Sequence, residues 1–153
     1  MTRSKLSVAA VADEKASGGY ALDEQVGFLM RVAMQRHTSI FTANMIDGLT
    51  QTQFAALAKL YEVGPSSQNH LGRLIFLDAA TIKGVVDRLS VRGFVTALSD
   101  PKDRRRRAVA LTEEGRRVTE AAMKVAARIT AETLTPLTAA EQRTIAALLK
   151  KLG

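Results

Sequence analysis

The segment from Ser66 to Thr112 constrains the fold of this 153-residue chain more than any other part. It begins with two short stretches that favour helix, separated by Phe76-Leu77. Two apolar runs follow, FVTAL and AVALT, joined by the polar and basic loop SDPKDRRRR. Two short apolar runs around a polar loop predict a β-hairpin. The expected order is therefore helix, turn, helix and hairpin, which is the outline of a winged helix-turn-helix, a fold that usually binds duplex DNA.

The second helix of the pair has a clear division of faces. Asp78 can cap its N-terminus, since the carboxylate accepts hydrogen bonds from the first free backbone N–H groups. Four apolar residues recur at helical spacing and predict a buried stripe: Ile82, Val85, Val86 and Leu89. The other face has little bulk and a few long polar side chains, as entry into a major groove requires, although a face exposed only to water fits the same pattern. The candidate DNA contacts here are Ala80, Thr81, Lys83, Gly84, Asp87 and Arg88.

The loop of the hairpin carries five cations, Lys102 and Arg104 to Arg107, against two acids, Asp100 and Asp103. Cations at a turn tip need an outside partner or stay in water, and arginines at such a tip can enter the minor groove. Asp103 stands two residues before Arg105, so we expect it to hold that guanidinium in a bidentate pair. The candidate contacts of the wing are Lys102, Asp103, Arg104, Arg105 and Arg106. From the first helix of the pair, Gln68 and Asn69 are candidate phosphate contacts.

The stretch LDAATIKGVVDRLSVRGFVTALSDPKDRRRRAVALTEEG resembles the winged-helix core of the MarR family of bacterial transcription regulators. The resemblance spans roughly residues 22–153. Its most specific part is the D-x-R signature of the wing, which falls on Asp103 and Arg105. The other matching motifs are Leu111-Thr112 with Gly115, Asp87-Arg88-Leu89 and Arg92-Gly93. The sequence departs from the helix-turn-helix pattern at Phe76, where many such sequences carry Gly, although an apolar side chain there can pack into the core.

This resemblance implies a mainly α-helical fold: a winged helix-turn-helix core with a two-stranded β wing, and N- and C-terminal helices that form a dimerisation region. The expected organisation is a disordered tail over residues 1–20 and one domain over residues 21–153. Within that domain, residues 49–112 form the DNA-binding core, and residues 21–47 and 113–153 form the dimerisation helices. An apolar stripe near the end of the chain also favours a homodimer, because little of its own domain is left to cover it: Ile145, Leu148, Leu149 and Leu152.

Net charge agrees with a nucleic-acid partner. The formal charge is +7, and residues 51–112 hold ten Lys and Arg against five Asp and Glu. The excess of cations therefore lies on the winged-helix segment, as binding to a polyanion requires. The chain contains no Cys, which excludes disulfides and thiolate metal sites, and neither His has a second ligand at metal spacing. We expect no cofactor, no metal and no membrane segment, and a cytoplasmic location.

The first long helix, expected over residues 22–47, carries the candidate ligand site. Its main apolar stripe includes Val26, Leu29, Met30 and Phe41, with His37 near the centre and Arg36 at the edge. His37 is either a core histidine satisfied by a backbone carbonyl or a polar anchor for a mostly apolar guest. The candidate ligand contacts are Arg36, His37 and Phe41, together with Phe54 of the next helix. On that next helix we expect one face to carry Phe54, Leu57, Ala58 and Tyr61.

These observations predict a transcription regulator, expected to be a repressor, that binds a palindromic operator in double-stranded DNA as a homodimer. By family precedent, the effector that releases it is an aromatic acid or the coenzyme A thioester of one. An architectural, weakly specific DNA-binding protein without a ligand is the alternative, but it has no need of a polar group in the apolar stripe of the first helix. RNA binding is disfavoured, because no aromatic residue stands among the wing cations. An enzyme is not expected, since no phosphate loop, nucleophile motif or metal cluster is present.

Overall fold

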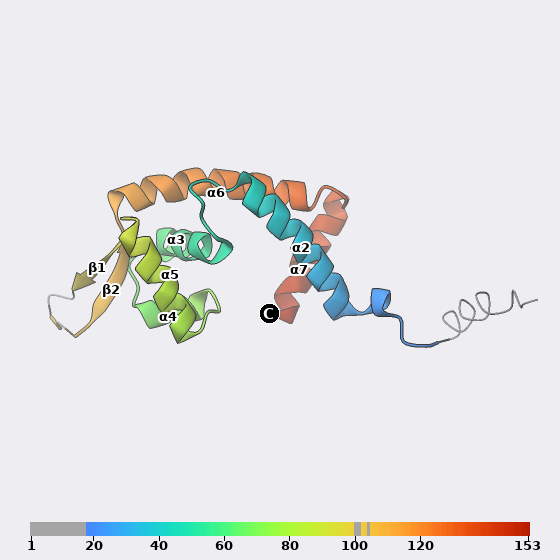
Figure 1. The fold of residues 1–153 in the computed structure, drawn as a ribbon, viewed down its shortest axis with the longest axis horizontal. Helices are drawn as coiled ribbons and strands as arrows, with labels where there is room; N and C mark the ends of the chain where they lie inside the picture. The colour runs from blue at the N-terminus through green and yellow to red at the C-terminus, as the bar shows by residue number, and fades with distance from the viewer. Residues whose placement is uncertain (1–17, 100–101, 104) are drawn as a thin grey trace, which may run out of the picture. The chain divides into compact units, whose positions relative to one another are not determined.

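The computed structural model of the chain describes residues 18–99, 102–103 and 105–153 (Figure 1). Most of the predicted N-terminal tail, residues 1–17, lies outside the described residues, and so does Arg104 of the wing. The chain divides into two compact units, residues 1–38 and residues 39–153.

The first unit contains a short 3-10 helix, η1 (Leu22–Glu24), and most of α2 (Val26–Asn44). The single helix predicted over residues 22–47 is therefore wrong at both ends. Gln25 is extended (φ −84°, ψ 130°), and its side-chain amide donates to the Ala21 carbonyl at 2.9 Å, which separates η1 from α2. Beyond α2, Asp47 and Gly48 have left-handed φ values of 53° and 61°, and a right-handed helix cannot continue through them.

The apolar stripe predicted on α2 is exposed over the first unit. Val26, Leu29 and Met30 all lie at the surface, whereas His37 is half-buried. A single copy of the chain thus leaves this face of α2 open to water, and large exposed apolar patches mark interaction surfaces in soluble proteins.

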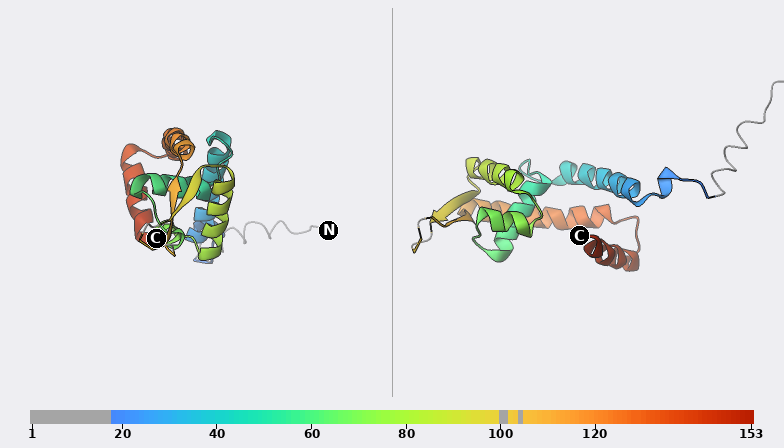
Figure 2. Two further views of the ribbon diagram at one scale, coloured as in Figure 1. Left: turned by 90° about the vertical axis from the view of Figure 1, so that its left-hand side faces the viewer. Right: turned by 90° about the horizontal axis from the view of Figure 1, so that it is seen from below.

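The second unit follows the predicted order of helix, turn, helix and hairpin. It contains α3 (Gln51–Val63), α4 (Gln68–Leu74), α5 (Ala79–Val91), β1 (Val95–Ser99), β2 (Arg107–Leu111), α6 (Glu113–Thr133) and α7 (Ala139–Leu152). Capping boxes begin α3 and α7, and the Thr112 side chain caps α6. Figure 2, in its view from below, shows α4 and α5 in front of α6.

The core of this unit forms around the buried stripe of α5. All four predicted residues, Ile82, Val85, Val86 and Leu89, are buried and pack with Leu57, Leu60 and Leu71. Each fully buried Leu or Ile side chain contributes about 1.5–3 kcal/mol to stability. The buried face of α3 differs from the predicted one, because α3 packs against both α5 and α6. Its buried residues are Gln53, Ala56, Leu57 and Leu60, while Tyr61 is half-buried and donates to Glu120 of α6 at 3.0 Å.

The wing is an antiparallel pair in which Val95 faces Leu111 and Ser99 faces Arg107. Its base is held on two sides. Ser66, just before α4, exchanges backbone hydrogen bonds with Val109 of β2 at 3.0 and 2.8 Å. On the other side Gly115 packs so closely that a Cβ there would lie 1.9 Å from the Phe94 carbonyl oxygen. These contacts fix where the hairpin leaves the helical core.

The turn between α4 and α5 differs from the expectation for Phe76. Its side chain does not pack into the core but is 87% exposed, and its backbone is left-handed with φ 58°. The reason is the way α4 ends: the Phe76 N–H donates to the Arg73 carbonyl and the Leu77 N–H donates to the Gly72 carbonyl. This is a Schellman motif. It turns Leu77, instead of Phe76, toward the core.

Candidate nucleic-acid interface

Helix α5 is held by its buried stripe and presents the opposite face to solvent. The Asp78 carboxylate accepts from the Thr81 N–H at 2.7 Å, as the sequence predicts for an N-cap. This hydrogen bond is the largest of the effects that lower the pKa of Asp78. Of the six candidate contacts on α5, Gly84 is half-buried and the others are exposed: Ala80, Thr81, Lys83, Asp87 and Arg88.

Two of the long side chains on this face are paired with each other. The Lys83 ammonium lies 2.7 Å from the Asp87 carboxylate, one helical turn further on, and both side chains remain exposed. Such a surface pair adds little stability, about 0–1 kcal/mol, but it restricts where the ammonium can lie. Arg88 lies close to Gly84, since a Cβ on Gly84 would be 3.7 Å from an Arg88 guanidinium nitrogen. The exposed face therefore combines a centre of small residues with two cations, of which Lys83 is held by Asp87.

Helix α4 contributes two further candidates, Gln68 and Asn69. Its N-cap is Ser67, whose hydroxyl accepts from the His70 N–H at 3.2 Å. Asn69 is exposed and Gln68 is half-buried in the first turn. Both stand close along the chain to Ser66, which is bonded to the wing.

In the wing, Asp103 does not hold the guanidinium of Arg105 as predicted. Its Oδ1 atom accepts from the backbone N–H of Arg105 at 2.9 Å, and its Oδ2 atom lies 4.0 Å from Nε of Arg106. An Asp side chain readily bonds to the backbone N–H two residues on, because that closes a local turn. Asp103 therefore shapes the backbone of the loop and leaves the Arg105 side chain exposed.

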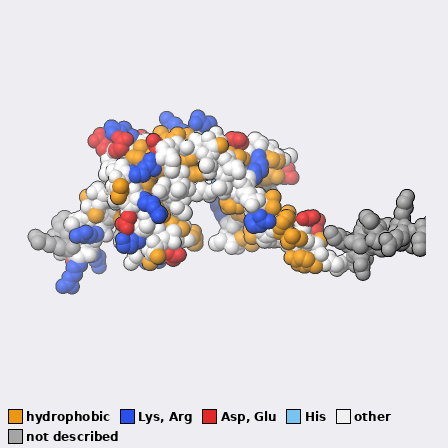
Figure 3. Space-filling view, viewed as in Figure 1, with side chains coloured by type: hydrophobic (Ala, Val, Ile, Leu, Met, Phe, Trp, Pro, Cys, Tyr) orange, Lys and Arg blue, Asp and Glu red, His pale blue; other side chains and the backbone are white. Residues whose placement is uncertain are grey.

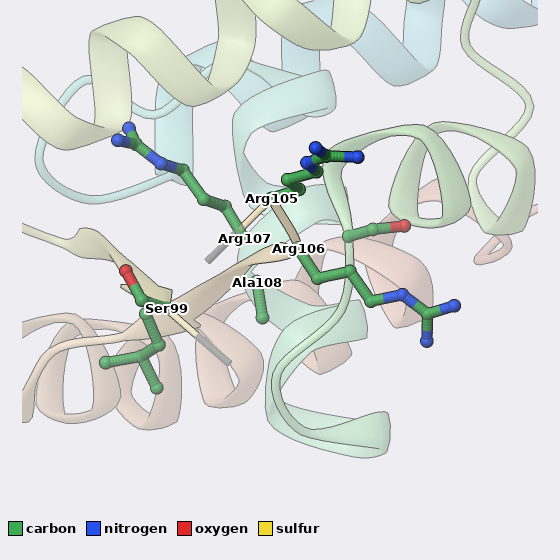
Figure 4. Close-up of a pocket in the computed structure, with 7 residues that line it drawn as sticks. Ser99, Arg105, Arg106, Arg107 and Ala108 are labelled. Atoms are coloured by element: carbon green, nitrogen blue, oxygen red, sulfur yellow. The ribbon is translucent and has the colours of Figure 1, made fainter. Parts of the chain in front are cut away.

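An open cleft of about 640 Å³ lies beside the wing (Figure 4). Three arginines, two serines and two apolar residues line it: Ser67, Leu98, Ser99, Arg105, Arg106, Arg107 and Ala108. The side chains of Arg105 and Arg107 extend to one side of the hairpin and that of Arg106 to the other (Figure 4). Figure 3 shows Lys and Arg side chains gathered at the wing end of residues 39–153. Arg107 was missed as a candidate contact, although it belongs to the same run of four arginines.

The candidate ligand residues are distributed over both units. Phe41 and Phe54 lie in the second unit, where their rings are 6.4 Å apart with an interplanar angle of 58°. Phe41 is buried with Val125 and Ile129, and Phe54 packs against the same cluster. Arg36 and His37 precede Phe41 on α2 and belong to the first unit, where Arg36 is exposed. The structure therefore shows two aromatic rings in contact within the apolar part of this candidate site.

Within residues 18–99, 102–103 and 105–153, no group of three or more His, Asp or Glu could hold a metal ion. In the part of the chain that the structure describes, no helix is both long and apolar enough to cross a membrane.

The chain has a helix-turn-helix whose second helix exposes one face, and an arginine-rich two-stranded wing follows it. These features define a winged-helix protein of the DNA-binding class. The model of the MarR family matches residues 49–106. The transcriptional repressor NicR of Pseudomonas putida is 42% identical over 134 residues, which cover 87% of this chain and 85% of NicR. The chain belongs to the MarR family of transcription regulators, and its members are not enzymes.

Two solved structures agree with this assignment. The crystal structure of a candidate transcriptional regulator from Pseudomonas aeruginosa has a TM-score of 0.84 and 47% identity, covering 87% of this chain and all of that one. BpsR of Bordetella bronchiseptica has a TM-score of 0.83 and 39% identity, with 88% of this chain and 97% of BpsR covered. The structure of BpsR addresses how 6-hydroxynicotinic acid regulates its binding to DNA.

Proposed function

We propose that this transcription regulator is a repressor that binds a palindromic operator as a homodimer. The observation that carries the proposal is the exposed face of α5, fixed by a buried stripe and accompanied by the arginines of the wing. The recognition helix would lie in the major groove and the wing would reach the adjacent minor groove. The protein would act on chromosomal DNA in the cytoplasm.

The homodimer is supported by apolar surface that one copy leaves uncovered. Ile145, Leu148, Leu149 and Leu152 of α7 are exposed, as are Val26, Leu29 and Met30 of α2. Both helices lie in the segments proposed for dimerisation, residues 21–47 and 113–153. A twofold-symmetric dimer places two copies of α5 on one face of the duplex, which requires two half-sites in inverted orientation.

The proposed effector is an aromatic acid or its coenzyme A thioester. The 39% identity to BpsR makes 6-hydroxynicotinic acid the first compound to test. We assign its binding to Arg36, His37, Phe41 and Phe54. The buried Phe41 and the adjacent Phe54 ring supply apolar surface, and Arg36 supplies a charge-assisted hydrogen bond to a carboxylate.

A competition binding experiment tests the DNA part of this proposal. A labelled duplex containing the inverted repeat upstream of the gene is bound at fixed salt and competed with the same duplex, random duplex and single strand. Arg105→Ala should lose roughly 1–3 kcal/mol on the operator, whereas Lys102→Ala should weaken all duplexes alike and lower the salt slope by about one. Equal competition by random duplex would instead indicate an architectural DNA-binding protein.

A further inference from the structure

The Phe76 side chain is not explained by the fold or by the contacts assigned so far. The left-handed backbone at this position is the one that Gly usually supplies in a Schellman motif, because a side chain makes it unfavourable. The hydrogen bonds of the motif use only the backbone of Phe76 and Leu77. The ring itself is 87% exposed, so it buries little apolar surface in the chain. Gly would fit this left-handed backbone better, and its lack of a ring would cost the free protein little buried apolar surface.

The place of Phe76 in the chain indicates what its ring could contact. It stands two residues before Asp78, the N-cap of α5, and the exposed residues Ala79, Ala80 and Thr81 follow directly. The N-terminal residues of a recognition helix are the ones that contact base edges. The N-terminal end of α5 and the wing both extend to the lower side of residues 39–153 in Figure 1. Phe76 therefore lies close to the surface proposed for DNA.

The chemistry around the ring favours DNA over a protein partner. Residues 51–112 carry ten cations against five acids, and Arg73, three residues before Phe76, is exposed. Such a surface attracts a polyanion. Duplex DNA also offers apolar groups next to its phosphates, namely the deoxyribose ring and the thymine methyl group, and Phe is one of the side chains that contacts that methyl.

We propose that the ring of Phe76 makes an apolar contact with operator DNA at the edge of the major groove that α5 enters. This inference rests on the proposed function, since it requires that α5 binds DNA. The partner group is a deoxyribose or a thymine methyl, which share the same apolar chemistry. The ring of Phe76 then contributes to DNA affinity in the complex, whereas it contributes little buried apolar surface to the free protein.

The test compares Phe76→Gly with the wild-type homodimer. Because Gly suits the left-handed backbone, the variant should melt about 2–4 °C higher than wild type, so a binding defect cannot be attributed to unfolding. Its affinity for the operator should fall about fivefold, the effect of losing part of a buried aromatic contact. Val91→Ala is the matched control: Val91 is 89% exposed at the other end of α5, and its truncation should leave operator affinity unchanged.

Operators with deoxyuridine in place of single thymines identify the group contacted. If it is a thymine methyl, one substitution should cost wild type about three- to fourfold and cost Phe76→Gly nothing. If it is a deoxyribose, no such position exists, yet Phe76→Gly still binds more weakly. Both results support the contact.

Unchanged operator affinity in Phe76→Gly would overturn the proposal. Dissociation of the Phe76→Gly dimer in analytical ultracentrifugation would also overturn it, since the ring would then serve the subunit interface. Failure of wild type to prefer the palindrome is a separate result, which contradicts the proposed function itself.

Discussion

At the scale of single residues, Asp78 and Glu141 show how a side chain fixes the start of a helix. The Asp78 carboxylate accepts from the Thr81 N–H, and the Glu141 carboxylate accepts from the Thr138 N–H at 2.9 Å. These hydrogen bonds are the main reason that the pKa of each group lies below its ordinary value, 3.8 for Asp78 and 4.5 for Glu141. A lowered pKa means that the folded state favours the charged form.

This predicts a specific dependence of stability on pH. The contribution of each carboxylate is fully present above the pKa of the unfolded chain and is lost as pH falls through the lower pKa of the folded state. Asp78→Asn should keep most of the cap, since Asn is also a good N-cap. Because it removes the titrating carboxylate, its melting temperature should fall less than that of wild type below about pH 4. Glu141→Gln serves as the matched variant at the other cap, and the double variant should show the flattest curve. An unchanged acid limb in the double variant would contradict this account.

At the scale of elements, local patterns predicted most of the second unit. The stripe of Ile82, Val85, Val86 and Leu89 and the N-cap at Asp78 depend on residues within one or two turns, and the structure confirms them. The exposed Phe76 was not predicted, because it follows from how α4 ends and from Leu77 taking the place in the core. The buried face of α3 was displaced because two other helices compete for it.

The same distinction applies to the wing. The two apolar runs predicted the hairpin and the run of arginines its charge, but neither pattern predicted which atoms Asp103 would bond. The choice between the Arg105 guanidinium and the Arg105 N–H depends on the course of the loop backbone, which spacing alone does not determine. In the structure the backbone N–H is the partner.

The contact of Asp103 leads to a prediction that separates loop shape from charge. Asp103→Asn retains an oxygen that can accept from the Arg105 N–H, so it should keep the loop and bind the operator at least as tightly as wild type. Asp103→Ala loses this hydrogen bond, worth about 0.5–1.5 kcal/mol, and should weaken specific binding toward the level of Arg105→Ala. Fluorescence anisotropy on operator and random duplex at two salt concentrations measures both variants. Tighter specific binding by Asp103→Ala would show that net charge, and not loop shape, governs the wing.

At the scale of the whole molecule, the exposed apolar residues of α2 and α7 determine what one chain can do alone. The sequence predicted their helical periodicity but not what covers them, because in the proposed dimer the covering surface would belong to a second copy. The proposed dimer sets the geometry of DNA binding: its half-sites should be about 10 bp apart, centre to centre. It also gives an effector a way to act, through the spacing of the two recognition helices.

The last prediction concerns that switch. An effector releases DNA only if it binds the DNA-incompatible spacing more tightly than the compatible one. By linkage, operator DNA must weaken the effector by the same factor that the effector weakens DNA, about 5- to 150-fold. Arg36→Ala should keep operator affinity and lose the response, because a carboxylate loses its charge-assisted partner. His37→Ala should do the same if His37 is a ligand anchor, whereas a structural His37 should lower the melting temperature without ligand.

The measurement is a titration of wild type and both variants on operator DNA, with 6-hydroxynicotinic acid, other aromatic acids and their coenzyme A thioesters. Calorimetry of the active compound with free and DNA-bound wild type then gives the reciprocal factor. Linkage makes the two factors equal for any equilibrium mechanism, so their agreement checks that both titrations have reached equilibrium. If both variants respond like wild type to the compound that releases wild type from DNA, the effector binds elsewhere and the assignment to α2 is wrong. That result would not affect the proposed DNA-binding surface.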